Sequence, residues 1–256
     1  MPPAQPLETE ERIALRHYKI AGLFITIADH GNALIGKMKP YEINTARQTD
    51  MTMVIDREKM LLTKERYPHL TLDEWEYIRT GFAFAHRLLD FDGFCLHSAA
   101  VALENQAILF SGPCGAGKST HAGLWQQYFG SGQAIVINDD KPALRLRKNN
   151  FYAYGTPWSG KGDLHTNIKV PLGAVVFLKQ AQENRIRRLD NREAVKMLVY
   201  QSLRPNSCMN KMNHLLTLLD ALLKKTAVYQ LYCQISPRAV ELVYKTIYKE
   251  KGMFVK

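Results

Sequence analysis

Residues 107–120 read AILFSGPCGAGKST, an apolar run followed at once by a glycine-rich loop with a lysine and a serine near its end. Gly112 and Gly117 let the backbone turn tightly, so that successive N–H groups face one anion. In such a loop Lys118 reaches the β- and γ-phosphates of a nucleotide, and the Ser119 hydroxyl binds Mg²⁺. The alternative is a glycine turn without a ligand, but apolar residues at helical spacing after the loop favour the phosphate-binding interpretation. It assigns the phosphate contacts to Gly112, Pro113, Cys114, Gly115, Ala116, Gly117, Lys118, Ser119 and Thr120.

A second candidate residue, His97, comes shortly before this loop. Two apolar runs, residues 96–103 and 106–110, flank Glu104 and Asn105, a pair suited to a tight hairpin turn. Antiparallel pairing about that turn predicts that His97 lies opposite Gly112. A group that titrates near neutral pH would then sit beside the bound phosphates. The alternative is a buried histidine whose ring is hydrogen-bonded to the backbone.

Two adjacent carboxylates follow the next apolar run. Residues 134–137 predict a strand, and Asp139 and Asp140 come just after its end. At a strand end in the same sheet as a phosphate loop, one carboxylate can bind Mg²⁺ while the other faces the attacking group. The familiar hydrolytic ATPase pattern places a glutamate after the aspartate, so the Asp-Asp pair argues against a motor-type ATPase. The alternative is that the pair caps the turn before Pro142.

A glycine-rich loop, residues 155–163, follows a predicted hairpin over residues 144–154. Its three glycines, one proline, one tryptophan and one lysine suit a segment that closes over a ligand. This interpretation assigns Trp158 and Lys161 to a substrate loop, and it predicts that Trp158 fluorescence changes when nucleotide binds. The alternative is an ordinary long connection.

The rest of the chain predicts one α/β domain over residues 13–256, after a disordered tail at 1–12. Residues 13–90 would supply strands and one helix, and residues 91–256 the nucleotide-binding core. Arg145 and Arg147 alternate with leucines, which predicts the wet face of a half-buried strand. In the first part of the chain we expect a strand at 18–27, a loop at 29–40, a strand at 51–55 and a helix at 72–89 with a possible break at Gly81. In the second part we expect a turn at Asn149 and Asn150, a central strand at 171–178 and a helix after the capping box of Asp190 and Glu193. A helix at 212–223, a strand at 228–233 and a last helix at 237–248 complete the expected elements.

Composition narrows the cellular setting and the partners. The 256 residues are 46% hydrophobic, enough for a full core, and carry a formal net charge of +10. No signal peptide and no apolar run long enough to span a bilayer is evident, so we expect a soluble cytoplasmic protein without a membrane partner. The net positive charge favours acidic binding partners. Basic residues are mostly dispersed and show no RNA-binding pattern, which argues against nucleic acid. Oligomerisation is left open.

The three motifs together resemble the catalytic domain of HPr kinase/phosphorylase and, more distantly, ATP-dependent phosphoenolpyruvate carboxykinase. The matching stretches are LHSAA at residues 96–100 at the start of a hairpin, the phosphate loop, and the strand that ends in Asp139 and Asp140, in that order and closely spaced. The resemblance extends over residues 90–180. It implies an α/β P-loop fold with a mixed sheet, of the phosphoenolpyruvate carboxykinase/HPr kinase type, with ATP and Mg²⁺ as cofactors.

The resemblance also implies roles for individual residues. The matching histidine, loop lysine and first aspartate of such enzymes act at the transferred phosphoryl group, which gives catalytic roles to His97, Lys118 and Asp139. The loop hydroxyl and the second aspartate hold metal, which gives Ser119 and Asp140. The implied activity is a kinase that phosphorylates a hydroxyl, such as serine in an acidic peptide, a small protein or a free amino acid. The alternatives are a carboxykinase or phosphorylase with another phosphoryl acceptor, and an ATP-binding regulatory module without transfer.

Overall fold

The structure, a computed structural model, describes residues 15–28, 31–44, 48–205 and 208–250. The tail predicted at residues 1–12 lies outside this part of the chain. Within the described ranges, no helix is both long enough and apolar enough to cross a membrane.

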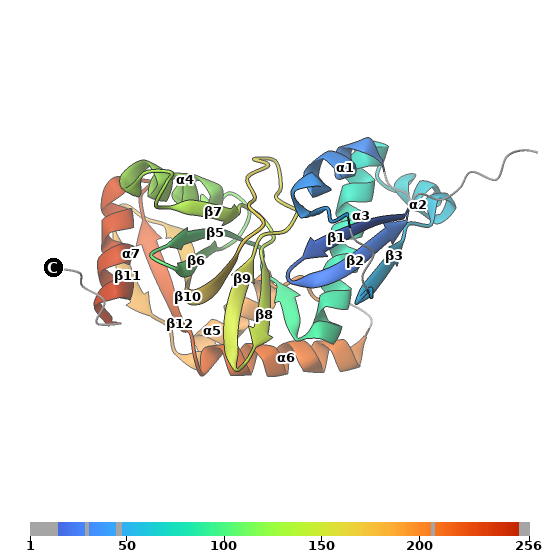
Figure 1. Cartoon of the computed structure of the whole chain (residues 1–256). Helices are drawn as coiled ribbons and strands as arrows, with labels where there is room; N and C mark the ends of the chain where they lie inside the picture. The colour runs from blue at the N-terminus through green and yellow to red at the C-terminus, as the bar shows by residue number, and fades with distance from the viewer. Residues whose placement is uncertain (1–14, 29–30, 45–47, 206–207, 251–256) are drawn as a thin grey trace, which may run out of the picture.

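The central feature is a mixed sheet organised around one long strand, β10 (Lys169–Gln180). The start of β10 pairs antiparallel with β9, whereas its later part runs parallel to β6 on one side and to β12 on the other. The sheet has the order β4-β8-β9-β10-β6-β5-β7, with β12 also on β10 and β11 on β12 (Figure 1). The strands are β4 (Gly93–Cys95), β5 (Ser98–Leu103), β6 (Gln106–Ser111), β7 (Ile135–Asn138), β8 (Ala143–Arg147), β9 (Asn150–Tyr154), β11 (Arg185–Arg188) and β12 (Ala227–Cys233).

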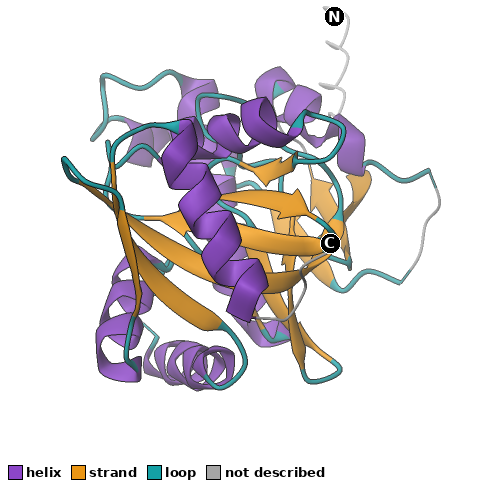
Figure 2. Ribbon diagram, turned by 90° about the vertical axis from the view of Figure 1, so that its left-hand side faces the viewer, coloured by secondary structure: helices purple, strands orange, loops and turns teal. Residues whose placement is uncertain are grey.

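Helices cover both faces of this sheet, so the expectation of an α/β fold with a mixed sheet is confirmed. Helices α4 (Lys118–Phe129) and α7 (Pro237–Glu250) pack on one face, and α5 (Asn191–Gln201) and α6 (Met209–Leu223) on the other (Figures 1 and 2). Strand β10 contributes Val175 to the core under α5 and α6 and Val176 to the core under α4 and α7. Its near-continuous apolar sequence is therefore explained by burial on both faces.

Residues 15–91 form a smaller sheet with its own helices, on the right of Figure 1. Two expectations here are wrong. The single strand expected at 18–27 is a hairpin of β1 (Leu15–Ile20) and β2 (Leu23–Ala28), because Ala21 and Gly22 both adopt positive φ and reverse the chain. The loop expected at 29–40 contains helix α1 (Asn32–Met38), followed by a 3₁₀ turn at Lys39–Tyr41. The remaining elements are β3 (Met51–Val54), α2 (Arg57–Lys64), α3 (Leu72–Leu88) and a 3₁₀ turn at Leu89–Phe91.

Helix α3 confirms its predicted start and runs without a break at Gly81. The side chain of Thr71 accepts a hydrogen bond from the amide of Glu74, and the Glu74 carboxylate accepts one from the amide of Thr71. A Cβ on Gly81 would lie 2.8 Å from Cδ1 of Trp158. The glycine thus allows the loop after β9 to pack directly on α3.

The position of Arg145 differs from the prediction that this residue lies on a solvent-exposed face of β8. Its side chain is 1% exposed, because the β1–β2 hairpin and the 3₁₀ turn after α3 cover that face of the strand. The guanidinium donates to the carbonyl oxygens of Phe91 and Ala21 at 2.8–3.1 Å. Arg147 is exposed, as predicted. The turn between β8 and β9 lies at Lys148 and Asn149, one residue earlier than expected.

Candidate phosphoryl-transfer site

The hairpin of β5 and β6 brings His97 beside the phosphate loop. Ser98 pairs with Ser111 and Leu103 with Gln106, with Glu104 and Asn105 between them at positive φ. This register is the one predicted, and it places His97 level with Gly112. The Ser111 hydroxyl donates to the carbonyl oxygen of His97 at 2.8 Å and ties the start of β5 to the end of β6.

The phosphate loop is open to solvent, and its lysine is folded over it. Gly115 and Gly117 adopt φ of 80° and 90°, which side-chain-bearing residues rarely do. Helix α4 begins at Lys118, whose ammonium donates to the carbonyl oxygens of Gly112 and Pro113 at 3.1 Å each. Burial lowers the pKa of Lys118, because the charged form loses solvation. An anion placed on this loop would offer the ammonium a partner of opposite charge in place of two neutral carbonyls.

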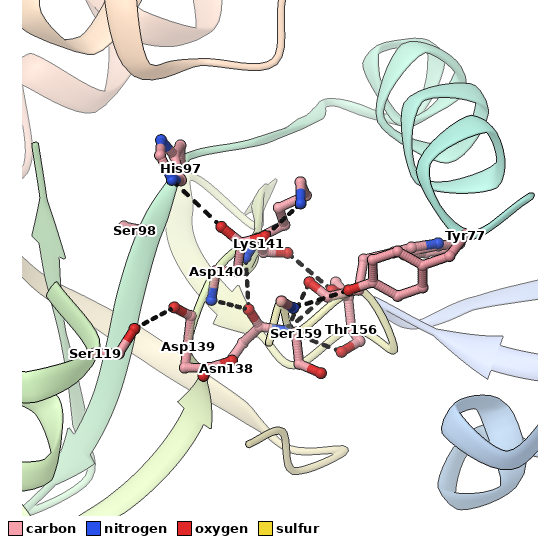
Figure 3. Close-up of polar contacts among 12 residues, drawn as sticks. Tyr77, His97, Ser98, Ser119, Asn138, Asp139, Asp140, Lys141, Thr156 and Ser159 are labelled. Atoms are coloured by element: carbon pink, nitrogen blue, oxygen red, sulfur yellow. Dashed lines mark hydrogen bonds and ion pairs between the residues drawn. The ribbon is translucent and has the colours of Figure 1, made fainter. Parts of the chain in front are cut away.

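The two aspartates are held by Asn138, the last residue of β7 (Figure 3). The amides of Asp140 and Lys141 donate to the Asn138 side-chain oxygen at 2.9 and 2.6 Å. The Asn138 side-chain amide donates to the carbonyl oxygen of Thr156 at 2.9 Å. Sequence analysis missed this residue, although an asparagine that bonds to backbone amides two residues on is a common turn device. Asn138 thereby fixes the turn that carries both carboxylates.

Asp140 is the ionised member of the pair. Burial alone would raise its pKa, but the hydrogen bond from His97 and the charge and hydrogen bond of Lys141 outweigh burial and lower the pKa to about 2. The His97 Nε2 atom lies 3.3 Å from one carboxylate oxygen, and the Lys141 ammonium contacts the other. Asp140 is therefore an anion at any pH near neutrality.

Asp139 lies in a different environment. Burial, and then the neighbouring negative charge of Asp140, raise its pKa from 3.8 to about 6. Its side chain is 4% exposed, and its buried Oδ1 atom has no hydrogen-bond partner among the described residues. The Ser119 hydroxyl donates to the backbone oxygen of Asp139 at 3.3 Å, which brings the start of α4 next to the pair. Two adjacent carboxylates with pKa values pushed apart are suited to different roles.

The donor set suits Mg²⁺ only together with phosphate oxygens. Among the residues described, no three His, Cys, Asp or Glu side chains form a metal-binding group. Mg²⁺ at phosphoryl-transfer sites is commonly held by one or two carboxylates, with water and substrate phosphates completing its octahedron. The Ser119 hydroxyl and the ionised Asp140 carboxylate are hard oxygen donors of this kind. Their residue types therefore fit Mg²⁺, provided that the Lys141 ammonium moves away from the Asp140 carboxylate.

The loop after β9 lies directly against both aspartates. A Cβ on Gly162 would lie 2.2 Å from Oδ2 of Asp139, and one on Gly160 would lie 2.9 Å from Cβ of Asp140. The Gly160 amide donates to the Tyr77 hydroxyl at 2.8 Å, so α3 supports the loop from behind. Only residues without a side chain allow the backbone this close to the carboxylates.

Trp158, which the sequence assigns to a substrate loop, lies in the protein core. The indole is 1% exposed, stacks on Phe84 at a centroid distance of 4.7 Å, and donates to the Thr80 hydroxyl at 3.1 Å. Trp158 therefore anchors the loop to α3 in the core. Its neighbour Lys161 is exposed and contacts neither aspartate in the described structure. A substrate role for Lys161 stays a prediction, as does the expected change of Trp158 fluorescence on nucleotide binding.

A cavity of about 350 Å³ opens beside this cluster. His97, Asp140 and Lys141 line it, together with residues that include Phe82 and Arg204. The His97 Nδ1 atom lies 3.2 Å from the side-chain oxygen of Gln201, another lining residue from the end of α5. A small hydroxyl-bearing group could thus reach the Asp140 carboxylate from this side.

Comparisons with known proteins add similarity in structure but none in sequence. No family model matches the chain. No curated protein matches its sequence. Among solved structures, the HPr(Ser) kinase/phosphatase from Coxiella burnetii is similar with a TM-score of 0.36 and 11% identity, over 62% of this chain and 96% of that chain. At this TM-score the match indicates no more than a structural relationship, and the geometry of the site must carry any functional conclusion.

Proposed function

We propose that this chain is an ATP- and Mg²⁺-dependent kinase that transfers the γ-phosphoryl group to a hydroxyl. The observation that carries the proposal is the pair of unlike carboxylates beside a phosphate loop. Asp140 has a pKa of about 2 and Asp139 of about 6, and Ser119 at the start of α4 bonds to the backbone of Asp139. The sequence resemblance to HPr kinase agrees with this combination.

In the proposed reaction Asp139 is the general base. Its unpartnered Oδ1 accepts the proton of the acceptor hydroxyl, and a pKa near 6 leaves it mostly ionised yet basic enough at neutral pH. The hydroxyl oxygen then forms a bond to the γ-phosphorus while the bond between that phosphorus and the β–γ bridging oxygen breaks. ADP leaves with the electron pair of the broken bond. The proton remains on Asp139 until product release.

The other residues stabilise charge and hold the nucleotide. Lys118 exchanges its two loop carbonyls for phosphate oxygens, and its positive charge opposes the charge that develops on the transferred group. His97 lies level with the loop and is held by Gln201 through Nδ1; once Asp140 turns to the metal, the Nε2–H of His97 is free to donate to the same group. Bound Mg²⁺ supplies charge neutralisation on the phosphates. Ser119 and Asp140 would be its protein ligands.

The acceptor enters through the cavity beside His97 and Asp140. Asp140 lines that cavity and Asp139 is not among its described lining residues, so the acceptor hydroxyl must pass Asp140 to reach Oδ1 of Asp139. Its size suits one side chain or a small molecule. Water would compete poorly there once Phe82 and its neighbours contact the acceptor.

The two aspartates can be separated by experiment. Asp139→Asn is expected to leave nucleotide affinity nearly unchanged and to lower transfer by about a hundredfold or more, the size of a general-base contribution. Asp140→Asn is expected to weaken Mg²⁺-dependent nucleotide binding, because Mg²⁺ prefers carboxylate oxygen to amide oxygen. His97→Ala should resemble Asp139→Asn. If Asp139→Asn abolishes metal binding while Asp140→Asn loses only turnover, the roles are reversed.

The reaction class itself is tested with γ-labelled ATP and a cell lysate of the source organism. A kinase should label an acceptor whose phosphate is stable as a serine or threonine ester. Transfer to a carboxylic acid or an enolate-forming acid would favour the carboxykinase alternative. Saturable ATP binding with no labelled product, in wild type and Asp139→Asn alike, would leave only a nucleotide-binding regulatory module.

A further inference from the structure

A second and larger cavity, of about 720 Å³, lies away from the carboxylates. It is bounded by the β1–β2 turn, by the outer halves of β8 and β9, and by the start of β10. Its lining includes four exposed cations, which come from three separate elements: Lys19, Arg147, Lys148 and Lys169. Among the described residues that line it, none is an aspartate or a glutamate. Positively charged side chains therefore surround this cavity, and no described lining residue carries a negative charge to balance them.

These cations have no acidic partners within the described ranges. Lys169 lies over the Tyr152 ring at 4.0 Å and Lys19 over the Phe24 ring at 5.8 Å, contacts that orient the ammonium groups but leave their charge unopposed. Neither Arg147 nor Lys148 forms an ion pair with a described residue. Elsewhere, exposed lysines such as Lys245 do pair with a carboxylate. This cavity thus differs from such sites in bringing four exposed cations without a described carboxylate partner around one hollow.

Arg145 lines the same cavity and adds a buried charge to it. Its guanidinium bonds only to neutral carbonyl oxygens, and the shortest of these contacts is 2.8 Å, to Ala21. A guanidinium has five N–H donors, so these bonds leave donor capacity for a ligand. Asp50 and Asp92 oppose this charge through space, but no described carboxylate is bonded to the guanidinium, and burying a cation without a bonded counter-ion is costly. A carboxylate bound in the cavity would supply that partner.

The size and direction of the cavity favour an extended ligand. Its lining runs along β8 and β9 from the Arg147–Asn150 pair to the neighbourhood of the Ala143–Tyr154 pair, roughly 13 Å at strand spacing. A run of four acidic residues has this length, whereas one small dicarboxylate would meet only part of the charge. Asp140 precedes β8 and is five residues before Arg145 in the chain, so their Cα atoms lie at most roughly 18 Å apart.

From these observations we infer that this cavity, hereafter the basic cavity, docks an acidic peptide segment of the phosphoryl acceptor. The inference rests on the proposed kinase function and adds the chemistry of the substrate to it: a peptide or protein with a cluster of glutamates or aspartates about five residues from the modified hydroxyl. The docking cations hold the acidic cluster, and the cavity beside His97 receives the hydroxyl.

Binding is tested without nucleotide, so that its outcome does not depend on catalysis. The probe is a fluorescein-labelled peptide with four consecutive glutamates, a five-residue neutral spacer and a serine, measured by fluorescence anisotropy at two salt concentrations. A second probe has the order reversed, and a third has glutamine for glutamate. The triple variant Arg147→Gln, Lys148→Gln, Lys169→Gln should bind the acidic probe about tenfold more weakly than wild type, since each exposed charge contributes a modest amount.

Lys179→Gln is the matched control. Lys179 lies on the same strand as Lys169 and also sits over a tyrosine, Tyr232, at 5.5 Å, but it is outside the basic cavity. This variant should bind the acidic probe as wild type does. Equal binding by wild type and the triple variant, or equal binding of the glutamate and glutamine probes, would overturn the inference. Full displacement of the peptide by tripolyphosphate at equal concentration would overturn it too, by assigning the basic cavity to small polyanions.

Transfer from γ-labelled ATP to the same peptides separates the two proposals. Specific peptide binding without labelling, together with no labelling of any lysate protein, would support the docking role of the basic cavity and refute the proposed kinase activity. Equal labelling by wild type and the triple variant would support the proposed kinase activity and refute the docking role of the basic cavity. The expected result is labelling with a KM about tenfold higher for the triple variant and an unchanged kcat.

Discussion

Asp139→Asn is expected to stabilise the folded protein at neutral pH while it impairs transfer. Burial and the adjacent Asp140 charge raise the pKa of Asp139 from 3.8 to about 6. Between these values the native carboxyl binds more protons than the unfolded one, so wild type loses stability as pH rises through this window. About two pKa units correspond to at most about 3 kcal/mol. Because asparagine does not titrate, the variant does not lose this stability as the pH rises.

Urea unfolding measures the difference, between pH 4 and pH 8 for wild type and Asp139→Asn and between pH 2 and pH 5 for wild type and Asp140→Asn. The free energy of unfolding should shift in favour of the variant between pH 4 and pH 6 and level off above pH 7. Asp140→Asn is the control of opposite sign: because His97 and Lys141 overcome burial and lower the pKa of Asp140 to about 2, wild type should gain on that variant as pH rises from 2 to 4. A difference between wild type and Asp139→Asn that is flat, or that grows in favour of wild type, would refute the assigned environment.

Two glycine substitutions test the packing around the site. Gly81→Ala should destabilise the protein by about 1–3 kcal/mol in thermal unfolding, because its Cβ would meet Trp158 at 2.8 Å, whereas Gly123→Ala, with open space in α4, should gain about 0.5–1 kcal/mol. Gly162→Ala should lower kcat by about tenfold to a hundredfold with little change in ATP affinity, because its Cβ would displace the Asp139 carboxylate. Unchanged turnover in that variant would mean that the loop moves away from Asp139 during the reaction.

The parts of the site that could be predicted from sequence are those fixed by local chemistry. Glu104 and Asn105 take up the positive φ angles of a two-residue turn, and that turn alone sets the register that carries His97 to the phosphate loop. The loop glycines and the capping boxes of Thr71 and Asp190 are likewise short-range devices, and they appear where expected. Each of these features depends on neighbours within a few residues.

The parts that could not be predicted depend on contacts between distant segments. Arg145 alternates with leucine as a surface residue would, and it is buried only because the β1–β2 hairpin covers β8. Trp158 is buried because α3, about 80 residues earlier, presents a glycine to it. The unequal pKa values of Asp139 and Asp140 likewise depend on burial and on His97, whose contact with Asp140 joins the ends of the neighbouring strands β5 and β7.

Isothermal titration with ATP, in the presence and absence of Mg²⁺, tests the central claim most directly, and it requires no knowledge of the acceptor. Wild type should bind Mg·ATP in a saturable way. Lys118→Ala should bind it roughly tenfold to a hundredfold more weakly, the effect of losing one charged hydrogen-bond donor to phosphate. Equal affinity in the two proteins, or no binding by wild type, would contradict a nucleotide site at the loop of residues 112–120.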